Sequence, residues 1–415
     1  MGVRSIYSRF INRNFHALTH KNFRYFWTGQ CVSLIGTWMQ SIGQSWLVLS
    51  ITNSPFLLGV LGMVQFMPVT LFSLFAGVIV DKYSKKKLLV FTQISSMLLA
   101  LSLSVLVFTN TIRYEYILIL AFLLGCINCI DMTTRQSFTI EIAGKEDLMN
   151  AIALNSATFN LARILGPSIG AIIMAYFGAG WCFLLNGLSY FAVLYGLYNI
   201  KVKSYVRKQV KGSSMLKEIK DGLKYVRSSK ILFETVLMVL VIGIFAFNYN
   251  VLVPSFTKLV LHESEKTYGL LMSFLGVGSL LGAIFASMRS RRGLSKRIMF
   301  ISSIALAILL VLNGLNINYI IAALLLGATG IFNIQFSTTA NSTLQLNSKD
   351  EYRGRVMSVY SFVFAGSAPL GSLFTGLVCD KMGPSQGFIF SGVSIIILIL
   401  IIKFYFNKKP KKCGY

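Results

Sequence analysis

Three charged residues stand inside long apolar runs of this chain, where an ionised side chain is costly. Asp131 and Arg135 belong to the run at 113–137, and Arg163 belongs to the run at 151–176. Charges at membrane depth are rare and mark proton or substrate pathways. We therefore predict that Asp131 and Arg163 form a proton-sensitive pair. The alternatives are a fixed structural salt bridge between them, or pairing of Asp131 with Arg135 at helical i,i+4 spacing.

Polar residues also form a stripe along the first apolar run. They recur in steps of three and four residues, which places them on one face of a helix: Gln30, Ser33, Thr37, Gln40 or Ser41, and Gln44. Such a face suits a water-filled cavity better than lipid. Later runs are predicted to add polar side chains to the same cavity, namely Asn128, Asn248, Tyr249, Asn250 and Asn333.

The elements that must carry these residues follow from the apolar runs. Of 415 residues, 55% are hydrophobic and only 13% are charged, about half the charged share of a soluble domain. Many runs approach the ~20 residues that an α-helix needs to cross a bilayer. We predict an all-α membrane protein with twelve transmembrane helices, at 23–51, 55–80, 87–109, 113–137, 151–176, 181–200, 231–260, 267–288, 297–315, 318–343, 355–379 and 385–406.

The net charge of +25 reflects an uneven distribution of Lys and Arg along the chain. If both termini are cytoplasmic, nearly all of the 39 Lys and Arg residues fall in cytoplasmic segments, which is the positive-inside pattern. The predicted outer segments contain Arg113, Lys258, Lys266 and Lys381. Contact with anionic lipid headgroups accounts for this positive charge, so the charge does not indicate nucleic-acid binding.

The two halves of the chain resemble each other at a constant offset of 205 residues. The matched positions include Gly77 with Gly282, Gly125 with Gly330, Asn128 with Asn333, Thr134 with Thr339, and Gly166 with Gly371. We therefore predict two pseudo-symmetric six-helix bundles, at 1–200 and 231–415, joined by a cytoplasmic linker at 201–230. Such repeats are typical of transporters whose site lies where the halves meet.

The stretch GVIVDKYSKKK separates the second and third runs and supplies a possible gate: Gly77, Asp81, Lys82, Lys85 and Lys86. The start of the third helix presents unpaired N–H groups that favour a carboxylate nearby. With six plus six spans, this stretch resembles the loop signature of the major facilitator superfamily, although Ser84 stands where that family usually has glycine. The stretches 22–59 and 131–167 resemble the branch that contains the enterobactin exporter, with macrolide-efflux proteins as more distant relatives.

This resemblance implies the major facilitator fold and transport by alternating access. It also implies that Asp81 latches the cytoplasmic helix ends in the outward-facing state, with Gly77 as a close-packing position. The alternative for the neighbouring lysines is that they only anchor the loop on the cytoplasmic side. The matching position in the second half is Ala286, so the latch would be asymmetric.

Glycines in the fifth and eighth runs are interpreted as helix-packing positions. Gly166, Pro167 and Gly170 form one small-residue face, and Gly278 with Gly282 forms another. The Gly-Pro pair also resembles a signature in the fifth helix of drug:proton antiporters, which favours export.

Enzyme chemistry is not indicated. The chain has no HExxH, no Walker motif and no nucleophile–base arrangement, and none of its three histidines lies in a predicted span. We expect no cofactor and no metal site. The predicted function is secondary transport, with proton-coupled export of a small organic molecule (a siderophore, macrolide or other drug-like compound) by a monomer in the cell membrane. The alternatives are an importer or uniporter of a small metabolite, and a non-transporting membrane receptor or assembly protein.

Overall fold

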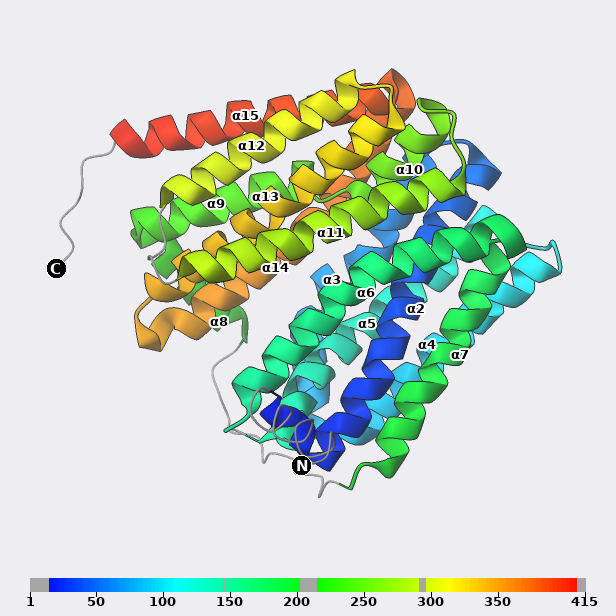
Figure 1. The fold of residues 1–415 in the computed structure, drawn as a ribbon. Helices are drawn as coiled ribbons and strands as arrows, with labels where there is room; N and C mark the ends of the chain where they lie inside the picture. The colour runs from blue at the N-terminus through cyan, green and yellow to red at the C-terminus, as the bar shows by residue number, and fades with distance from the viewer. Residues whose placement is uncertain (1–14, 145, 202–214, 291–295, 409–415) are drawn as a thin grey trace, which may run out of the picture. The chain divides into compact units, whose positions relative to one another are not determined.

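The computed structural model describes residues 15–144, 146–201, 215–290 and 296–408, and within these ranges the secondary structure is helical, with no strand. The elements, labelled in Figure 1, are η1 (His16–Thr19), α2 (Lys21–Thr52), α3 (Pro55–Lys82), α4 (Lys85–Phe108), α5 (Tyr114–Ala143), α6 (Leu148–Phe177), α7 (Ala179–Asn199), α8 (Met215–Ser228), α9 (Lys230–Phe245), α10 (Tyr249–Leu259), α11 (Glu265–Ser290), α12 (Lys296–Leu315), α13 (Tyr319–Leu346), α14 (Asp350–Met382) and α15 (Pro384–Lys408).

Eleven helical segments in the described part of the chain are long and apolar enough to cross a membrane, with α9 and α10 counted together as one. Helix α2 falls short on hydropathy although it has 32 residues, because it carries the polar stripe. Most of that stripe is buried, including Gln30, Ser33 and Gln44. Together these segments confirm the all-α membrane fold.

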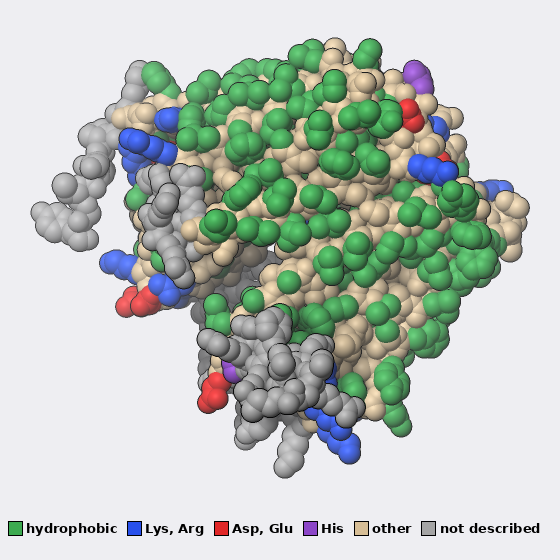
Figure 2. All heavy atoms as spheres, viewed as in Figure 1, with side chains coloured by type: hydrophobic (Ala, Val, Ile, Leu, Met, Phe, Trp, Pro, Cys, Tyr) green, Lys and Arg blue, Asp and Glu red, His purple; other side chains and the backbone are tan. Residues whose placement is uncertain are grey.

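The surfaces of these helices are apolar where a soluble protein would be polar. Exposed side chains on α4 include Phe91, Leu98 and Val105, and those on α6 include Phe159 and Ile172. Figure 2 shows such hydrophobic side chains over the visible helices, with Lys and Arg side chains towards the margins of the view. Lipid, rather than water, is the solvent that suits these faces.

The chain divides into two compact units, residues 1–47 with 71–210, and residues 48–70 with 211–415. In the first unit α4 packs against α5 and α7, and in the second α12 packs against α13 and α15. These two sets of helices are equivalent under the internal repeat, so the pseudo-symmetry is present in the packing as well as in the sequence. The boundaries at 200 and 230 stay a prediction.

Close helix contacts occur at the glycines interpreted as packing positions. A Cβ atom on Gly170 of α6 would lie 3.0 Å from Met39 Cγ of α2. A Cβ atom on Gly282 of α11 would lie 2.6 Å from the Ile331 carbonyl oxygen of α13. A larger residue at position 282 requires the neighbouring helix to shift, whereas one at position 170 requires the Met39 and Ile42 side chains to move, so small residues favour these close separations.

The structure differs from the predicted elements at two places. The run at 231–260 is not one helix, because α9 ends at Phe245 and α10 begins at Tyr249. Asn248 explains the break locally: its side-chain amide donates to the Ile244 carbonyl at 2.6 Å and so satisfies the end of α9. The second difference is α8, a helix within the stretch expected to be a linker, whose Tyr225 ring stacks on Tyr352 of α14 at 4.3 Å.

Candidate functional site

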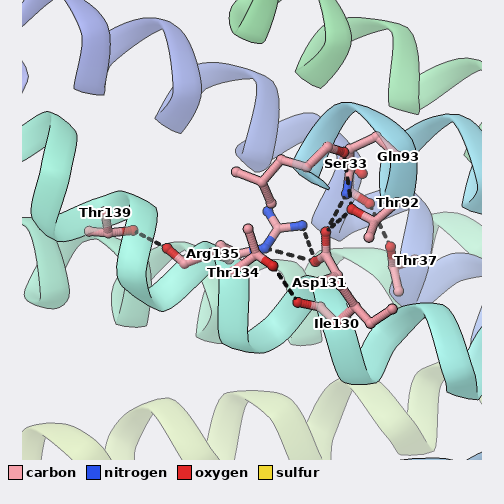
Figure 3. Close-up of polar contacts among 10 residues, drawn as sticks. Ser33, Thr37, Thr92, Gln93, Ile130, Asp131, Thr134, Arg135 and Thr139 are labelled. Carbon is pink, nitrogen blue, oxygen red and sulfur yellow. Dashed lines mark hydrogen bonds and ion pairs between the residues drawn. The ribbon is translucent and has the colours of Figure 1, made fainter. Parts of the chain in front are cut away.

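The carboxylate of Asp131 is the centre of a buried polar cluster in the first unit. Asp131 lies on α5 and is 8% exposed. Its Oδ1 accepts hydrogen bonds from Thr92 Oγ1 at 2.7 Å and Gln93 Nε2 at 2.8 Å. Its Oδ2 accepts from Arg135 Nε at 3.0 Å and Nη2 at 2.5 Å. Figure 3 shows these side chains turned towards the carboxylate.

Two neighbouring helices build this arrangement. Thr92 and Gln93 are adjacent on α4, which packs against α5, so both reach the same oxygen. Asp131 and Arg135 are four residues apart on α5 and therefore lie on one helix face. The Arg135 guanidinium also lies 5.7 Å from the centre of the Phe26 ring, within the range of a cation–π contact. Charge and hydrogen bonding thus offset the cost of burying Asp131 and of partly burying Arg135.

The pairing of Asp131 corrects one expectation. Asp131 is paired with Arg135, the i,i+4 alternative, and not in the cross-helix arrangement with Arg163. Arg163 lies half-buried on α6, and its Nη2 donates to Asn160 Oδ1 at 3.4 Å. The physical reason is local: a partner one turn away on the same helix needs no particular register between helices.

Buried polar atoms of the first unit that have no hydrogen-bond partner among the described residues include Gln30 Nε2, Gln93 Oε1 and Arg135 Nη1. Two of them belong to side chains that already hold Asp131. Buried donors and acceptors in native proteins are nearly always satisfied by protein or by water. These atoms are shut off from the surface in this conformation, so a polar group of a ligand meets them only after the surrounding helices move.

The polar stripe of α2 is tied to α7. Asn186 Nδ2 donates to Gln40 Oε1 at 2.6 Å, and the buried side chain of Tyr190 lies close to Thr37 and Asn186. Thr37, the exposed member of the stripe, also donates to the Ser33 carbonyl at 2.9 Å. The stripe is thus a set of helix-to-helix contacts as well as a polar face.

The polar residues predicted in the second unit gather at the α9–α10 break. Asn248 is buried and bonded to Ile244 as described above, and Asn333 Nδ2 of α13 donates to the Tyr249 hydroxyl at 3.4 Å. Asn250 is half-buried on α10, as is Asn128 on α5 in the first unit. Interrupted membrane helices often mark substrate sites, because their ends leave backbone groups open to a ligand.

The basic stretch after α3 makes contacts that the sequence did not suggest. Lys85 Nζ lies 3.1 Å from Glu141 Oε2 on α5, and Lys86 Nζ donates to the Ile200 carbonyl at 2.7 Å, at the end of α7. Lys82 is exposed. The side chain of Asp81 lies outside the described part of the structure, so its role as a latch stays a prediction.

Sequence reasoning missed Thr92, Gln93, Asn186 and Tyr190. A signal existed for the first two, because a Thr-Gln pair in an otherwise apolar run needs hydrogen-bond partners at membrane depth. Nothing in the sequence alone indicated that the partner would be Asp131.

Two pseudo-symmetric helical halves, with a charged pair among the helices of one half, are typical of multi-span secondary transporters. The chain belongs to the major facilitator superfamily, in the family described as "Transmembrane secretion effector", whose model matches residues 13–412. This membership confirms the resemblance seen in the loop motif and in the stretches 22–59 and 131–167.

Similar proteins are transporters of several cargoes. The staphyloferrin A transporter of Staphylococcus aureus is 29% identical over 94% of this chain and 97% of its own length. Macrolide efflux protein A of Streptococcus pyogenes is 22% identical over 90% of this chain and 93% of its own. The enterobactin exporter of Citrobacter koseri is 20% identical over 92% and 91%.

Solved structures show the same fold. The nucleoside transporter NupG, as a D323A mutant, superposes with a TM-score of 0.72 over 94% of this chain and 99% of its own, at 12% identity. A bacterial homolog of the human lysosomal transporter Spinster, in an inward-facing and occupied conformation, gives a TM-score of 0.69 over 94% and 98%, also at 12% identity. At this identity the likeness concerns the fold alone.

Proposed function

We propose that this protein exports a small organic molecule, of the siderophore, macrolide or drug-like class, in exchange for protons. The observation that carries the proposal is the ion pair of buried Asp131 with half-buried Arg135, beside an acceptor on Gln93 and a donor on Arg135 that no described residue satisfies. The similar proteins are named for transport of staphyloferrin A, macrolides and enterobactin, which supports these classes of cargo. We further propose that both termini are cytoplasmic, in keeping with the distribution of Lys and Arg, and that the protein works as a monomer in the cell membrane.

The geometry suggests how proton and cargo would compete. Ionised Asp131 holds Arg135 and Gln93 in fixed orientations, so that Arg135 Nη1 and Gln93 Oε1 stay available to a polar group of the cargo. A proton on Asp131 removes the charge that holds the Arg135 guanidinium. Both side chains are then released and the cargo site is lost. Competition of this kind favours exchange of cargo for protons, because each ligand binds a different state of the carrier.

Import or uniport of a small metabolite is the alternative function, and the similarity in fold to a nucleoside transporter is the observation behind it. A receptor or assembly role has less support, because the proteins similar in sequence along nearly the whole chain are transporters.

The test is transport in proteoliposomes with and without an imposed pH gradient, using siderophores and macrolides that a deletion strain fails to expel. The wild type should concentrate cargo only with the gradient. The double variant Asp131→Asn with Arg135→Gln should assemble, because no unpaired charge remains, but should not concentrate cargo. Gradient-driven accumulation by the double variant at the wild-type rate would exclude the pair from coupling, and cargo movement that ignores the gradient would favour uniport.

A further inference from the structure

The short segment before α2 is docked on the start of α6. The backbone N–H of Ala17, in η1, donates to Asn150 Oδ1 at 3.0 Å, and Ala17 is completely buried. His20 joins η1 to α2, and its Nε2 lies 2.7 Å from Asp147 Oδ2. Asp147 directly precedes α6, and Asn150 lies in its first turn. These contacts tie the start of α2 to the start of α6, and we call Ala17, His20, Asp147 and Asn150 the first brace.

Helix α8 is docked on the start of α14 in the second unit. The Tyr225 ring of α8 stacks on the Tyr352 ring, with 4.3 Å between the ring centres. Gly222 of α8 is buried against α14, since a Cβ atom there would lie 3.0 Å from the Arg355 carbonyl oxygen. The N–H of Lys349, just before α14, donates to the Tyr225 hydroxyl at 3.2 Å. We call Gly222, Tyr225, Tyr352 and Arg355 the second brace.

The two braces occupy equivalent positions of the internal repeat. Every member of the second brace follows its counterpart by the same 205 residues that relate the two halves: Ala17 and Gly222, His20 and Tyr225, Asp147 and Tyr352, and Asn150 and Arg355. The packing beneath is equivalent too, because Ala151 and Val356, at matching positions, are both buried. Helix α8 is therefore the counterpart of the segment before α2, and one joint is built twice with different chemistry.

The chemistry of the first brace depends on pH. Histidine is the side chain that changes charge between about pH 5 and pH 8, whereas aspartate in contact with water stays ionised over that range. With His20 protonated, its contact with Asp147 is an ion pair. Without that proton the contact is at most a hydrogen bond between a neutral ring and a carboxylate, and it loses much of its strength. The second brace is a ring stack, which needs no charge.

Most charged groups around the first brace keep their charge over this range. The neighbouring charged or titratable side chains are His16, Lys21 and Arg24 on the same segment and α2, Glu146 beside Asp147, and Lys201 at the end of α7. Lys21 Nζ lies 5.9 Å from the centre of the Tyr25 ring, and Lys85 at the start of α4 is paired with Glu141. Lysine, arginine and glutamate side chains at a surface stay charged between about pH 5 and pH 8, so they add a constant background. His16 is the exception, and it is exposed at the start of η1.

We propose that the first brace is a pH-sensitive switch, which ties α6 to α2 firmly when His20 is protonated and loosely when it is not. The second brace then holds α14 equally well in both conditions. The joint matters for transport because α2 carries the polar stripe, and α6 packs against α2 at Gly170. With the predicted orientation the switch reads the pH of the cytoplasm. Protons admitted by export would then tighten it, a consequence that rests on the proposed function, whereas the switch itself does not.

The size of the effect follows from the exposure of the pair. The His20 side chain is 43% exposed and that of Asp147 is 28% exposed, so water and salt screen their attraction. Ion pairs of this kind contribute little to stability. We therefore expect local opening at the start of α6 to become about threefold more frequent when the proton is lost. A modest change suits a reversible switch, because it shifts a population without unfolding the helix.

Hydrogen–deuterium exchange measures that opening directly. Full-length protein in lipid nanodiscs is exchanged at about pH 5.5 and about pH 8, and mass spectrometry follows two equivalent peptides, 148–160 and 353–365. The ratio of their exchange rates cancels the pH dependence of the exchange reaction itself. In the wild type, peptide 148–160 should exchange about threefold faster at the higher pH, relative to its counterpart. The same ratio at both pH values would overturn the proposal.

Variants of His20 assign the response to this side chain. His20→Arg keeps a positive charge at both pH values and should hold peptide 148–160 at the slow, low-pH ratio. His20→Ala has no charge to lose and should stay at the fast ratio. A wild-type response to pH in either variant would overturn the proposal.

His16→Ala is the matched control, because it removes the same residue type from the same segment. It should keep the wild-type response of peptide 148–160 to pH. Loss of the response in this variant would overturn the proposal too, because the titration would then not belong to the contact between His20 and Asp147.

Moving the pair to the second brace tests the switch if the His20 variants fail to fold. In the variant Tyr225→His with Tyr352→Asp, peptide 353–365 should exchange about threefold faster at the higher pH, relative to the same peptide of wild-type protein measured in parallel. No response of this peptide, in a variant that elutes as a single species, would overturn the proposal. Neither cargo nor a gradient enters these measurements, so their outcome is separate from that of the proposed function.

Discussion

Helices α5 and α13 occupy equivalent places in the two halves but carry different chemistry. Thr134 and Thr339 are buried at matching positions, as are Gly125 and Gly330. The positions of Asp131 and Arg135, however, are taken on α13 by Phe336 and Ala340, which are 1% and 0% exposed. One framework thus holds an ion pair in the first half and ordinary apolar packing in the second.

This difference indicates that the fold does not need the ion pair. Replacing a buried ion pair by well-packed apolar residues is often neutral or stabilising, and α13 shows that the framework accepts such residues. A costly pair kept in one half only is therefore better explained by function than by stability.

The largest effect should follow from removing one member of the pair. Arg135→Ala leaves Asp131 buried without its cation, which in soluble proteins costs roughly 3–5 kcal/mol. We expect poor assembly, measured as loss of the monodisperse peak in fluorescence-detected size-exclusion chromatography. Arg163→Ala is the control, because Arg163 does not pair with Asp131 in the structure. Equal losses in the two variants would contradict the assignment of Arg135 as the partner.

A smaller effect should follow from removing the neutral donors on α4. Thr92→Val and Gln93→Leu each delete one hydrogen bond to the Asp131 carboxylate, worth about 1.5–3 kcal/mol when the acceptor is charged. We expect folded protein with a lower melting temperature and slower gradient-driven transport. Thr109→Val is the control, because Thr109 is exposed at the end of α4 and its hydroxyl donates to the Val105 carbonyl, far from Asp131 in sequence. This variant should leave both measurements unchanged. Wild-type behaviour of both α4 variants would show that Asp131 does not depend on them.

The loop after α3 offers a second contrast between the halves, because Asp81 corresponds to Ala286. If Asp81 is a latch that stabilises one conformation, Asp81→Asn should reduce turnover while cargo affinity and expression stay near wild type. Turnover and affinity are measured separately, by initial transport rates and by equilibrium binding. Unchanged turnover would reduce the loop to a topological anchor. Tyr83→Ala, at an exposed neighbour outside the predicted gate, is the matched variant and should transport normally.

The smallest effect should appear on the apolar side of the comparison. Phe336→Met nearly conserves volume and introduces no charge, so we expect a loss of about 1 kcal/mol or less in stability. Gradient-driven transport should keep its dependence on pH. Thermal unfolding and transport at several pH values check both statements. A change in proton dependence comparable to that of the Asp131 variants would show that coupling extends into the second half.

Much of the fold was predictable because it depends on solvent. In lipid every backbone polar group must be hydrogen-bonded within the protein, so long apolar runs are predicted to be helices. The order of these helices along the chain then follows directly from the order of the runs. The repeat at 205 residues likewise predicted equivalent helix packing, which α4 and α12 show. The break in the run at 231–260 was not predicted, because it depends on one side-chain bond from Asn248 to the end of α9.

Hydropathy and the internal repeat sufficed to predict an all-α membrane fold, two related halves and costly charges at Asp131, Arg135 and Arg163. The three-dimensional arrangement was needed to show that Arg135 is the partner of Asp131 and that Thr92 and Gln93 complete the carboxylate. The difference lies in the range over which these signals act. Hydropathy and periodicity act along one segment, whereas a hydrogen bond depends on a few ångströms between atoms that the chain alone does not bring together.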